Sequence, residues 1–382
     1  MRVLLFSPLI GRDRAGGDTS YTEALLAEPP NGVTYTTYGE ALDDGSMVLR
    51  GRRPRHGETN SDLGLFCLRV GETALRRAKL MFAEQLWFAT IDPDAFDLVH
   101  LHLFSLRQVV SHVPVVSSAG YPLPVLYHQA KGWSARRTSV ALALEDRLAR
   151  RTGASVPWLR PARSDLMTAY SGHFRDWLVE RHVPERQVRV MGTALPALPP
   201  ATRHTDGRTL AFVAKDYQRK GGDIAVAAFE QMRHTDPTLS LLVATETPAA
   251  VRSLAGIPGV EIFDNPARSV VLQEILPRTD VLLAPTRLDC GAPYGLLEAL
   301  QRGCGIVTTT VPWLDERLGG PAVRRVPLSV DAVSEAAADL LAGDRTRLAE
   351  EAHHLWATTF SMQQLHADLL SAYRHAIAAT DG

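Results

Sequence analysis

The order of hydrophobic and polar positions along this chain predicts an α/β protein with two sheets. Apolar runs of strand length alternate with stretches in which apolar residues recur at helical spacing, a pattern typical of parallel sheets covered by helices. The clearest runs cover residues 2–7, 96–103, 123–129 and 166–171 in the first half, and residues 209–214, 239–244, 260–263, 280–285 and 305–310 in the second. Each half is therefore expected to form its own doubly wound unit.

A proline-rich segment without periodicity, residues 191–207, separates the two halves. Such a composition is typical of a linker between domains. We expect a first domain over residues 1–195 and a second over residues 206–358. Residues 359–382 are predicted to form a terminal helix that has Ser361 as its N-cap and crosses back to the first domain.

One stretch departs from this order. Residues 50–56 are basic, and a run with helical spacing follows over residues 72–88, whose apolar side includes Leu86 and Trp87. We predict a helix that packs on the core and exposes one basic face. The alternative, usual for an amphipathic basic helix, is that residues 50–88 dock a partner or make weak peripheral contact with a membrane.

Length and charge narrow the range of functions. The chain has 382 residues, of which 45% are hydrophobic, so it is long enough for two separate cores. Its net charge is −1, and no nucleic-acid partner is expected. Residues 1–195 nevertheless carry 24 lysines and arginines against 20 acidic residues, a mild basic excess that hints at the partner of the first half.

The cysteines and the start of the chain indicate a cytoplasmic protein. Cys67, Cys290 and Cys304 are too widely spaced for a disulfide framework or a metal cluster, so a reducing compartment fits best. Pro8 interrupts the apolar start and charged residues follow it, which predicts a first strand instead of a signal peptide. No apolar stretch reaches the length of a membrane span. A peripheral place at the inner membrane face remains the alternative, through residues 50–88.

Lysine is rare here, and its placement is informative. Two of the four lysines, Lys215 and Lys220, lie in one short segment between a predicted strand and a predicted helix over residues 223–232. Compact ammonium groups beside Gly221 and Gly222 at a helix start suit a diphosphate. The alternative is a pair of solvated surface lysines.

A second informative block covers residues 279–310. A predicted strand ends near Pro285, a glycine-containing loop follows, and a helix begins near Tyr294. Glu298, one turn into that helix, would be able to hold both hydroxyls of a ribose. The alternative is a solvated carboxylate, but the neighbouring residues are apolar, and burial of an idle carboxylate is costly.

These two blocks, residues 212–222 and 280–310, resemble the donor-binding half of the retaining glycosyltransferases of family 4. That family has the GT-B fold, with two Rossmann-like domains that face each other across a cleft. The resemblance implies that Lys215 and Lys220 hold the donor diphosphate and that Glu298 binds the ribose of the nucleotide.

The first half resembles the family less specifically. Gly16 and Gly17 lie in a glycine-rich segment after the first strand, similar to the loop whose backbone amides approach the phosphates in the family. Residues 97–102 resemble the family's Asp-x-x-His-x-His strand end, which implies that His102 lies by the donor sugar. His100 and His102 share one face of the strand, and structural histidines are the alternative.

The chain departs from the family at the first glutamate of its Glu-x7-Glu motif. Cys290 occupies that position, with Asp289 directly before it and Gly291 directly after it. Either a one-residue insertion lets Asp289 replace the carboxylate and hold a hydroxyl of the donor sugar, or the carboxylate is absent. We favour the first case. The donor-binding set is thus expected to include Asp289, Cys290 and Gly291.

The resemblance as a whole implies a retaining, hexosyltransferase-like enzyme whose donor is a sugar linked to UDP or GDP. The acceptor would be a small molecule, a glycan or a lipid-linked compound, docked on the mildly basic first half. No cofactor and no metal are expected: Asp92 and Asp94 lie in a turn before a strand, and the two lysines would replace a divalent ion. A nucleotide-sugar 2-epimerase and a non-catalytic nucleotide-sugar-binding subunit are the alternatives.

Overall fold

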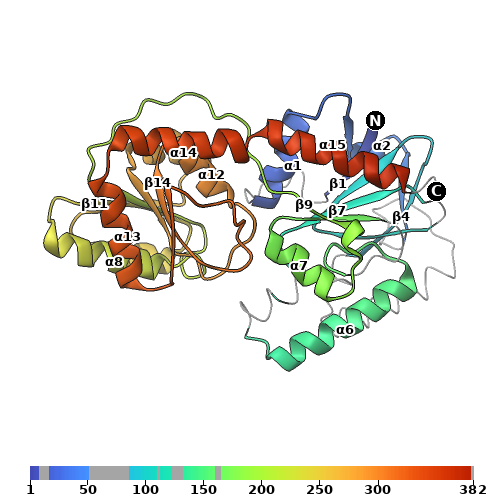
Figure 1. The fold of residues 1–382 in the computed structure, drawn as a ribbon, viewed down its shortest axis with the longest axis horizontal. Helices are drawn as coiled ribbons and strands as arrows, with labels where there is room; N and C mark the ends of the chain where they lie inside the picture. The colour runs from blue at the N-terminus through green and yellow to red at the C-terminus, as the bar shows by residue number, and fades with distance from the viewer. Residues whose placement is uncertain are drawn as a thin grey trace. The chain divides into compact units, whose positions relative to one another are not determined.

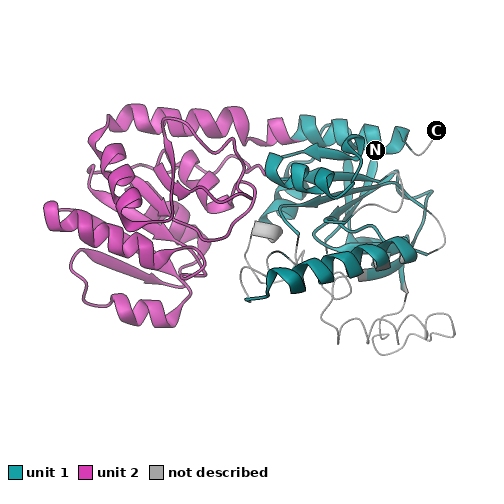
Figure 2. Ribbon diagram, turned by 60° about the horizontal axis from the view of Figure 1, so that its bottom comes forward, with its two compact units in different colours: residues 1–191, 366–382 teal, residues 192–365 magenta. Residues whose placement is uncertain are grey.

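The computed structural model describes residues 1–7, 17–50, 86–109, 112–122, 125, 132–159 and 165–379. The chain divides into two compact units (Figure 2). The first unit contains residues 1–191 together with residues 366–382, and the second contains residues 192–365.

The first unit is built on a six-stranded parallel sheet. Its order is β2 (Thr34–Thr37), β1 (Arg2–Phe6), β5 (Leu98–His102), β7 (Val115–Ala119), β8 (Leu166–Ala169) and β9 (Val188–Val190). Its helical segments are α1 (Gly17–Ala27), α2 (Tyr38–Asp43), α6 (Ala135–Thr152), α7 (Gly172–Glu180) and the short turn η1 (Glu185–Gln187). The strands predicted at residues 2–7, 96–103 and 166–171 are confirmed.

A small second sheet in this unit corrects one prediction. It consists of β3 (Met47–Arg50), β4 (Leu86–Ile91) and β6 (Ser105–Gln108). Leu86 and Trp87 were expected in a helix but lie in β4. Along that strand Trp87, Ala89 and Ile91 are buried, so the apolar period is two, as in a strand.

The rest of the predicted helix, residues 72–85, lies outside the described residues. Three other predicted features also lie almost wholly outside the described residues. They are the basic segment 50–56, the strand predicted at residues 123–129, and the surface over residues 50–88 that was considered for membrane contact. Among the described residues, no helix is both long and apolar enough to cross a membrane.

The second unit contains another six-stranded parallel sheet. Its order is β12 (Val260–Asp264), β11 (Ser240–Thr245), β10 (Thr209–Val213), β13 (Val281–Ala284), β14 (Gly305–Thr309) and β15 (Val323–Val326). All five strands predicted in this half are confirmed, and β15 is additional.

Helices cover both faces of this sheet (Figure 1). The helices α8 (Gly222–Thr235) and α13 (Val330–Ala342) pack on each other and on one face, whereas α12 (Tyr294–Gln301) and α14 (Arg345–Thr359) cover the other. The remaining helical segments of this unit are α9 (Pro248–Leu254), α10 (Arg268–Val270), the π-helical η2 (Val271–Ile275) and α11 (Leu276–Arg278). The last helix, α15 (Met362–Ala378), begins in this unit, and its residues from His366 on belong to the first unit. The core between α8, α13 and the sheet includes Phe212, Phe229, Val243, Leu283 and Val307.

Candidate functional site

The two loops singled out in the sequence leave the second sheet at the same edge. β10 and β13 are adjacent and parallel, with Leu210 opposite Val281. Their carboxyl ends therefore lie side by side, and the loop that leads into α8 meets the loop that leads into α12. Open α/β sheets bind ligands at this edge.

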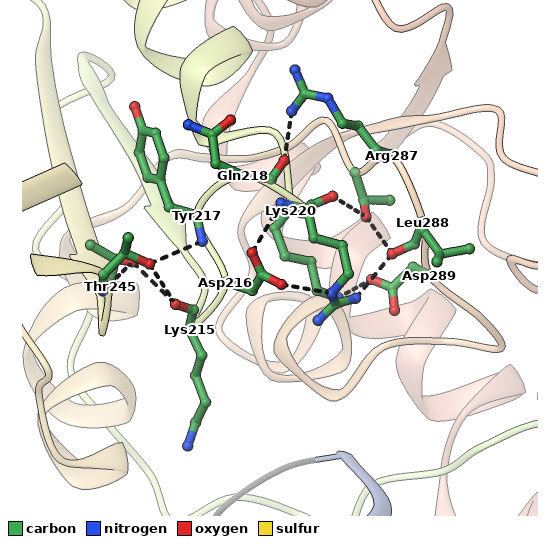
Figure 3. A network of polar contacts seen from close by, with 12 residues as sticks. Lys215, Asp216, Tyr217, Gln218, Lys220, Thr245, Arg287, Leu288 and Asp289 are labelled. Atoms are coloured by element: carbon green, nitrogen blue, oxygen red, sulfur yellow. Dashed lines mark hydrogen bonds and ion pairs between the residues drawn. The ribbon is translucent and has the colours of Figure 1, made fainter. Parts of the chain in front are cut away.

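Backbone contacts join the two loops. The Arg287 N–H donates to the Arg219 carbonyl (2.9 Å), and the Arg219 guanidinium donates to the Leu288 carbonyl (3.0 Å). The Arg287 guanidinium binds the Asp223 carboxylate with two bonds of 2.7 Å and donates to the Gln218 carbonyl (Figure 3). These bonds from Arg287 hold the pKa of Asp223 below its ordinary value, against the opposing effect of burial.

Two glycines permit this close approach. Gly221 has φ +74°, and a Cβ there would lie 2.0 Å from the Pro285 carbonyl oxygen of the other loop. A Cβ on Gly222 would lie 2.3 Å from the ring of Tyr217. The Gly-Gly pair therefore brings the two loops together and lets α8 begin where it does.

The two lysines have different surroundings. Lys220 forms an ion pair with Asp289 across the two loops, and its side chain is only 22% exposed. Lys215 is about half exposed and pairs with Glu246 at 2.8 Å. Its side chain extends away from the loop contacts (Figure 3), while its carbonyl accepts a bond from Thr247. The interpretation as two solvated surface lysines is therefore wrong for Lys220.

The segment after Asp289 is also fixed. The Gly291 N–H donates to the Trp313 carbonyl (2.9 Å), and the Asp315 N–H donates to the Gly291 carbonyl (2.8 Å). The Asp315 carboxylate is fully buried and binds Arg317 at 2.7 Å. Cys290 is half-buried between these fixed neighbours.

Glu298 is a buried carboxylate with a cationic partner. It is 7% exposed, and its Oε1 accepts bonds from the Arg268 Nε (2.8 Å) and Nη2 (2.7 Å). Burial raises the pKa of Glu298, and the Arg268 charge only partly opposes this rise. The alternative of a solvated helix residue is therefore wrong.

In the first unit, His102 lies at the carboxyl end of β5 and is 1% exposed. Its Nδ1 lies 3.0 Å from both the Ser118 Oγ and the Tyr170 hydroxyl, and its ring stacks on Tyr21. As their spacing predicts, His100 and His102 share a face, because both rings reach the same Ser118 hydroxyl. Burial lowers the pKa of both histidines, so both are neutral at pH 7.

Of the two glycines predicted to approach the phosphates, only Gly17 is among the described residues. Gly16 lies outside the described residues, and Gly17 is the first residue of α1. Asp92 and Asp94 lie in a turn, where the Asp92 carboxylate accepts the Asp94 N–H (2.9 Å), as expected. Among the residues that the structure describes, no three His, Cys, Asp or Glu side chains are grouped so as to hold a metal ion.

The sequence reasoning missed the partners of the charged site residues. Glu246 follows β11 and Arg268 follows β12, so both leave the same edge of the sheet as the lysines. The sequence contained a signal for both residues, since each lies just after a correctly predicted strand. Asp315, after β14, follows the same rule.

Residues 207–343, which include both loops at this edge, match the sequence family described as Glycosyl transferases group 1. The matched segment covers less than half of the chain. No curated protein matches the chain.

Solved glycosyltransferase structures resemble the chain over nearly its whole length. A glycosyltransferase from Rickettsia africae ESF-5 is 13% identical, with 98% of each chain covered and a TM-score of 0.58. Anabaena Alr3699/HepE, in complex with UDP and glucose, is 11% identical, with 97% of this chain and 98% of that chain covered and a TM-score of 0.59. WaaG, a glycosyltransferase involved in lipopolysaccharide biosynthesis, is 17% identical over 100% of both chains, with a TM-score of 0.54. The predicted GT-B fold class is confirmed, and residues 207–343 are similar to the group 1 glycosyl transferases.

The close approach at Gly221 generates a stability prediction. Gly221→Ala should lower the free energy of unfolding by about 3 kcal/mol or more, because positive φ and a backbone clash add together. Gly256 is the matched control, since it has φ +91° and a Cβ added there would meet nothing within 4 Å. Gly256→Ala should cost only about 1 kcal/mol, from the backbone conformation alone. Equal urea midpoints for the two variants would contradict the clash.

Proposed function

We propose that this protein is a retaining glycosyltransferase that binds a nucleoside-diphosphate sugar at the carboxyl edge of the second sheet. The observation that carries the proposal is the meeting of two loops from adjacent strands. One loop presents Lys220, and the other presents Asp289 and leads into the helix of Glu298. Such a donor needs a cation for its diphosphate, a carboxylate for a hydroxyl of its sugar and a buried partner for the diol of its ribose.

The proposed role of the lysines follows from the charge that develops in the reaction. Breaking the anomeric bond leaves negative charge on the diphosphate and positive charge on the sugar. Lys220, and Lys215 beside it in the same loop, would stabilise the leaving diphosphate as fixed positive charges. Such help is greater in the transition state than in the ground state, so it accelerates the chemical step.

The ion pair between Lys220 and Asp289 gives the proposal a sequence of events. Without donor, Asp289 neutralises Lys220 and holds it at the loop junction. When the diphosphate binds, Lys220 gains a second anionic partner. We propose that Asp289 then accepts a hydrogen bond from a hydroxyl of the donor sugar, with Cys290 and Gly291 forming the neighbouring wall.

Glu298 is proposed to bind the ribose. Its Oε1 is oriented by Arg268, and a carboxylate accepts charge-assisted bonds from two adjacent hydroxyls. Within the first unit, His102 is proposed to act on the donor sugar and the Gly16–Gly17 segment on the phosphates, as the family resemblance implies.

The donor nucleotide is proposed to be UDP, because HepE was solved with UDP and glucose and also with UDP-glucose. The test is a panel of UDP- and GDP-sugars with release of the nucleoside diphosphate as readout. The product is then analysed by NMR for its anomeric configuration. Interconversion of two donors without acceptor would indicate the epimerase instead, and tight binding without any turnover would indicate a binding subunit.

Lys220→Ala should lower kcat/KM for the donor by about 100-fold or more, because a transition-state charge contact is lost. Arg252→Ala removes an exposed positive charge from α9 and is the matched control. If Lys220→Ala keeps more than half of the turnover of the control, the diphosphate assignment is wrong.

Asp289→Ala should lower donor kcat/KM by about 10- to 100-fold, the loss expected for one charged hydrogen bond of about 1.5–3 kcal/mol. Affinity for free UDP should stay the same or rise, because a negative charge beside Lys220 disappears. Cys290→Ser, at the next position, should be nearly silent. Weaker UDP binding by Asp289→Ala would mean that Asp289 only positions Lys220.

Glu298→Gln should weaken the binding of free UDP, measured by calorimetry, without lowering the stability of the fold. Because burial raises the pKa of Glu298, the folded state disfavours the ionised carboxyl. The wild type should therefore lose stability relative to Glu298→Gln as pH rises above the ordinary carboxyl range. Glu335→Gln, at an exposed position of α13, should change neither quantity. Unchanged UDP affinity in Glu298→Gln would remove the ribose assignment.

A further inference from the structure

A continuous series of polar contacts runs through the core of the first unit to His102. The Tyr35 hydroxyl lies 2.8 Å from the Tyr373 hydroxyl, which lies 2.6 Å from the His100 Nδ1. The His100 Nε2 lies 3.2 Å from the Ser118 Oγ, which lies 3.0 Å from the His102 Nδ1. Apart from Tyr35, which is half-buried, every member is at most 1% exposed.

Three different parts of the fold supply these groups. Tyr35 lies on β2, and the two histidines and Ser118 lie on adjacent strands, where His102 is directly opposite Ser118 in the register. Tyr373 lies on α15, in the part of that helix that belongs to the first unit. The last helix of the chain is thus hydrogen-bonded, through two intermediates, to the side chain proposed to act on the donor sugar.

Donation can run through the whole series in two directions. A neutral imidazole carries one N–H, so whichever of its nitrogens donates, the other accepts. If Tyr373 donates to the His100 Nδ1, then the His100 Nε2 donates to Ser118, Ser118 donates to the His102 Nδ1, and the His102 Nε2 carries a hydrogen. In the reverse direction, the His102 Nε2 carries a lone pair.

Acidity distinguishes the two directions. A phenol is acidic and an imidazole nitrogen is basic, so the 2.6 Å contact between Tyr373 and His100 favours the phenol as donor. Near His102, the Ser118 and Tyr170 hydroxyls both lie 3.0 Å from Nδ1, which has a single lone pair, and donation by either one leaves the hydrogen on Nε2. Burial raises the pKa of Tyr373 well above its ordinary value, so this phenol keeps its hydrogen.

We propose that Tyr373, through His100 and Ser118, fixes His102 as the tautomer that carries hydrogen on Nε2, so that it acts as a neutral hydrogen-bond donor. Its Nε2 is buried and has no hydrogen-bond partner among the described residues. An N–H of this kind suits an accepting oxygen of a ligand, and a buried donor without a partner is costly until one binds. Tyr373, His100 and Ser118 are positioning residues in this proposal. The identity of the ligand that would accept the hydrogen bond from His102 rests on the proposed function.

The tautomer is measured directly on the protein without any donor. Two-bond nitrogen–proton correlation spectra of the ¹⁵N-histidine-labelled chain distinguish the two ring nitrogens, and His102→Gln and His100→Gln assign the signals. Both histidines should show Nε2 protonated and Nδ1 unprotonated. A His102 that carries its hydrogen on Nδ1 would overturn the proposal, whether or not the enzyme uses a nucleotide sugar.

Tyr373→Phe should change the tautomer without a matching loss of stability. The variant removes one hydroxyl, so His100 loses its fixed donor, the His102 signals should move toward a mixture of tautomers, and donor kcat/KM should fall by about 10-fold. Leu369→Ala, also fully buried on α15, is the matched control. It should lower Tm and leave the tautomer unchanged.

Unchanged His102 signals in Tyr373→Phe would overturn the role of the last helix. If Tyr373→Phe does not fold, Ser118→Ala removes the central hydroxyl and is read in the same way. The spectra thus test the relay on the free protein, and only the kcat/KM comparison depends on the proposed function.

Discussion

The junction of the two loops after β10 and β13 depends on one steric constraint: the Pro285 carbonyl oxygen passes where a side chain at Gly221 would be. Because no Cβ intervenes, the loop after β10 and the loop after β13 share backbone hydrogen bonds through Arg219 and Arg287. Lys220 and Asp289 meet across that junction as a result. A lysine on an isolated loop would have far more freedom, and its charge would be worth less in a reaction.

Each charged group proposed to act on the donor already has a partner of opposite sign in the free protein. Lys215 pairs with Glu246, Lys220 with Asp289, and Glu298 with Arg268. This arrangement limits the cost of holding such charges where they are partly or wholly buried. In the proposed site a donor would bind by exchange of partners, and its affinity would reflect a difference between two sets of ion pairs.

The sequence was sufficient to predict the two large parallel sheets, but not every strand of the first unit. Nine apolar runs were predicted as strands, and those in the second unit are all found. Most of them are buried on both faces and are therefore nearly continuous in apolar residues, whereas β12 is only partly buried. β7 was missed since Val115–Ala119 contains two serines, yet one of them, Ser118, connects both histidines. β4 was taken for a helix because Trp87 and its neighbours are apolar, and only burial reveals the period of two.

The site residues were proposed from residue type and place, whereas their ion-pair partners required the three-dimensional structure. The contrast between the lysines has a practical consequence for labelling experiments. In a chain with four lysines, reagents that acylate primary amines have few targets. Lys215, at 53% exposure, should react readily, while Lys220, at 22% and paired with Asp289, should react slowly. Modification mapped by mass spectrometry would thus report on the occupancy of this loop without any designed probe.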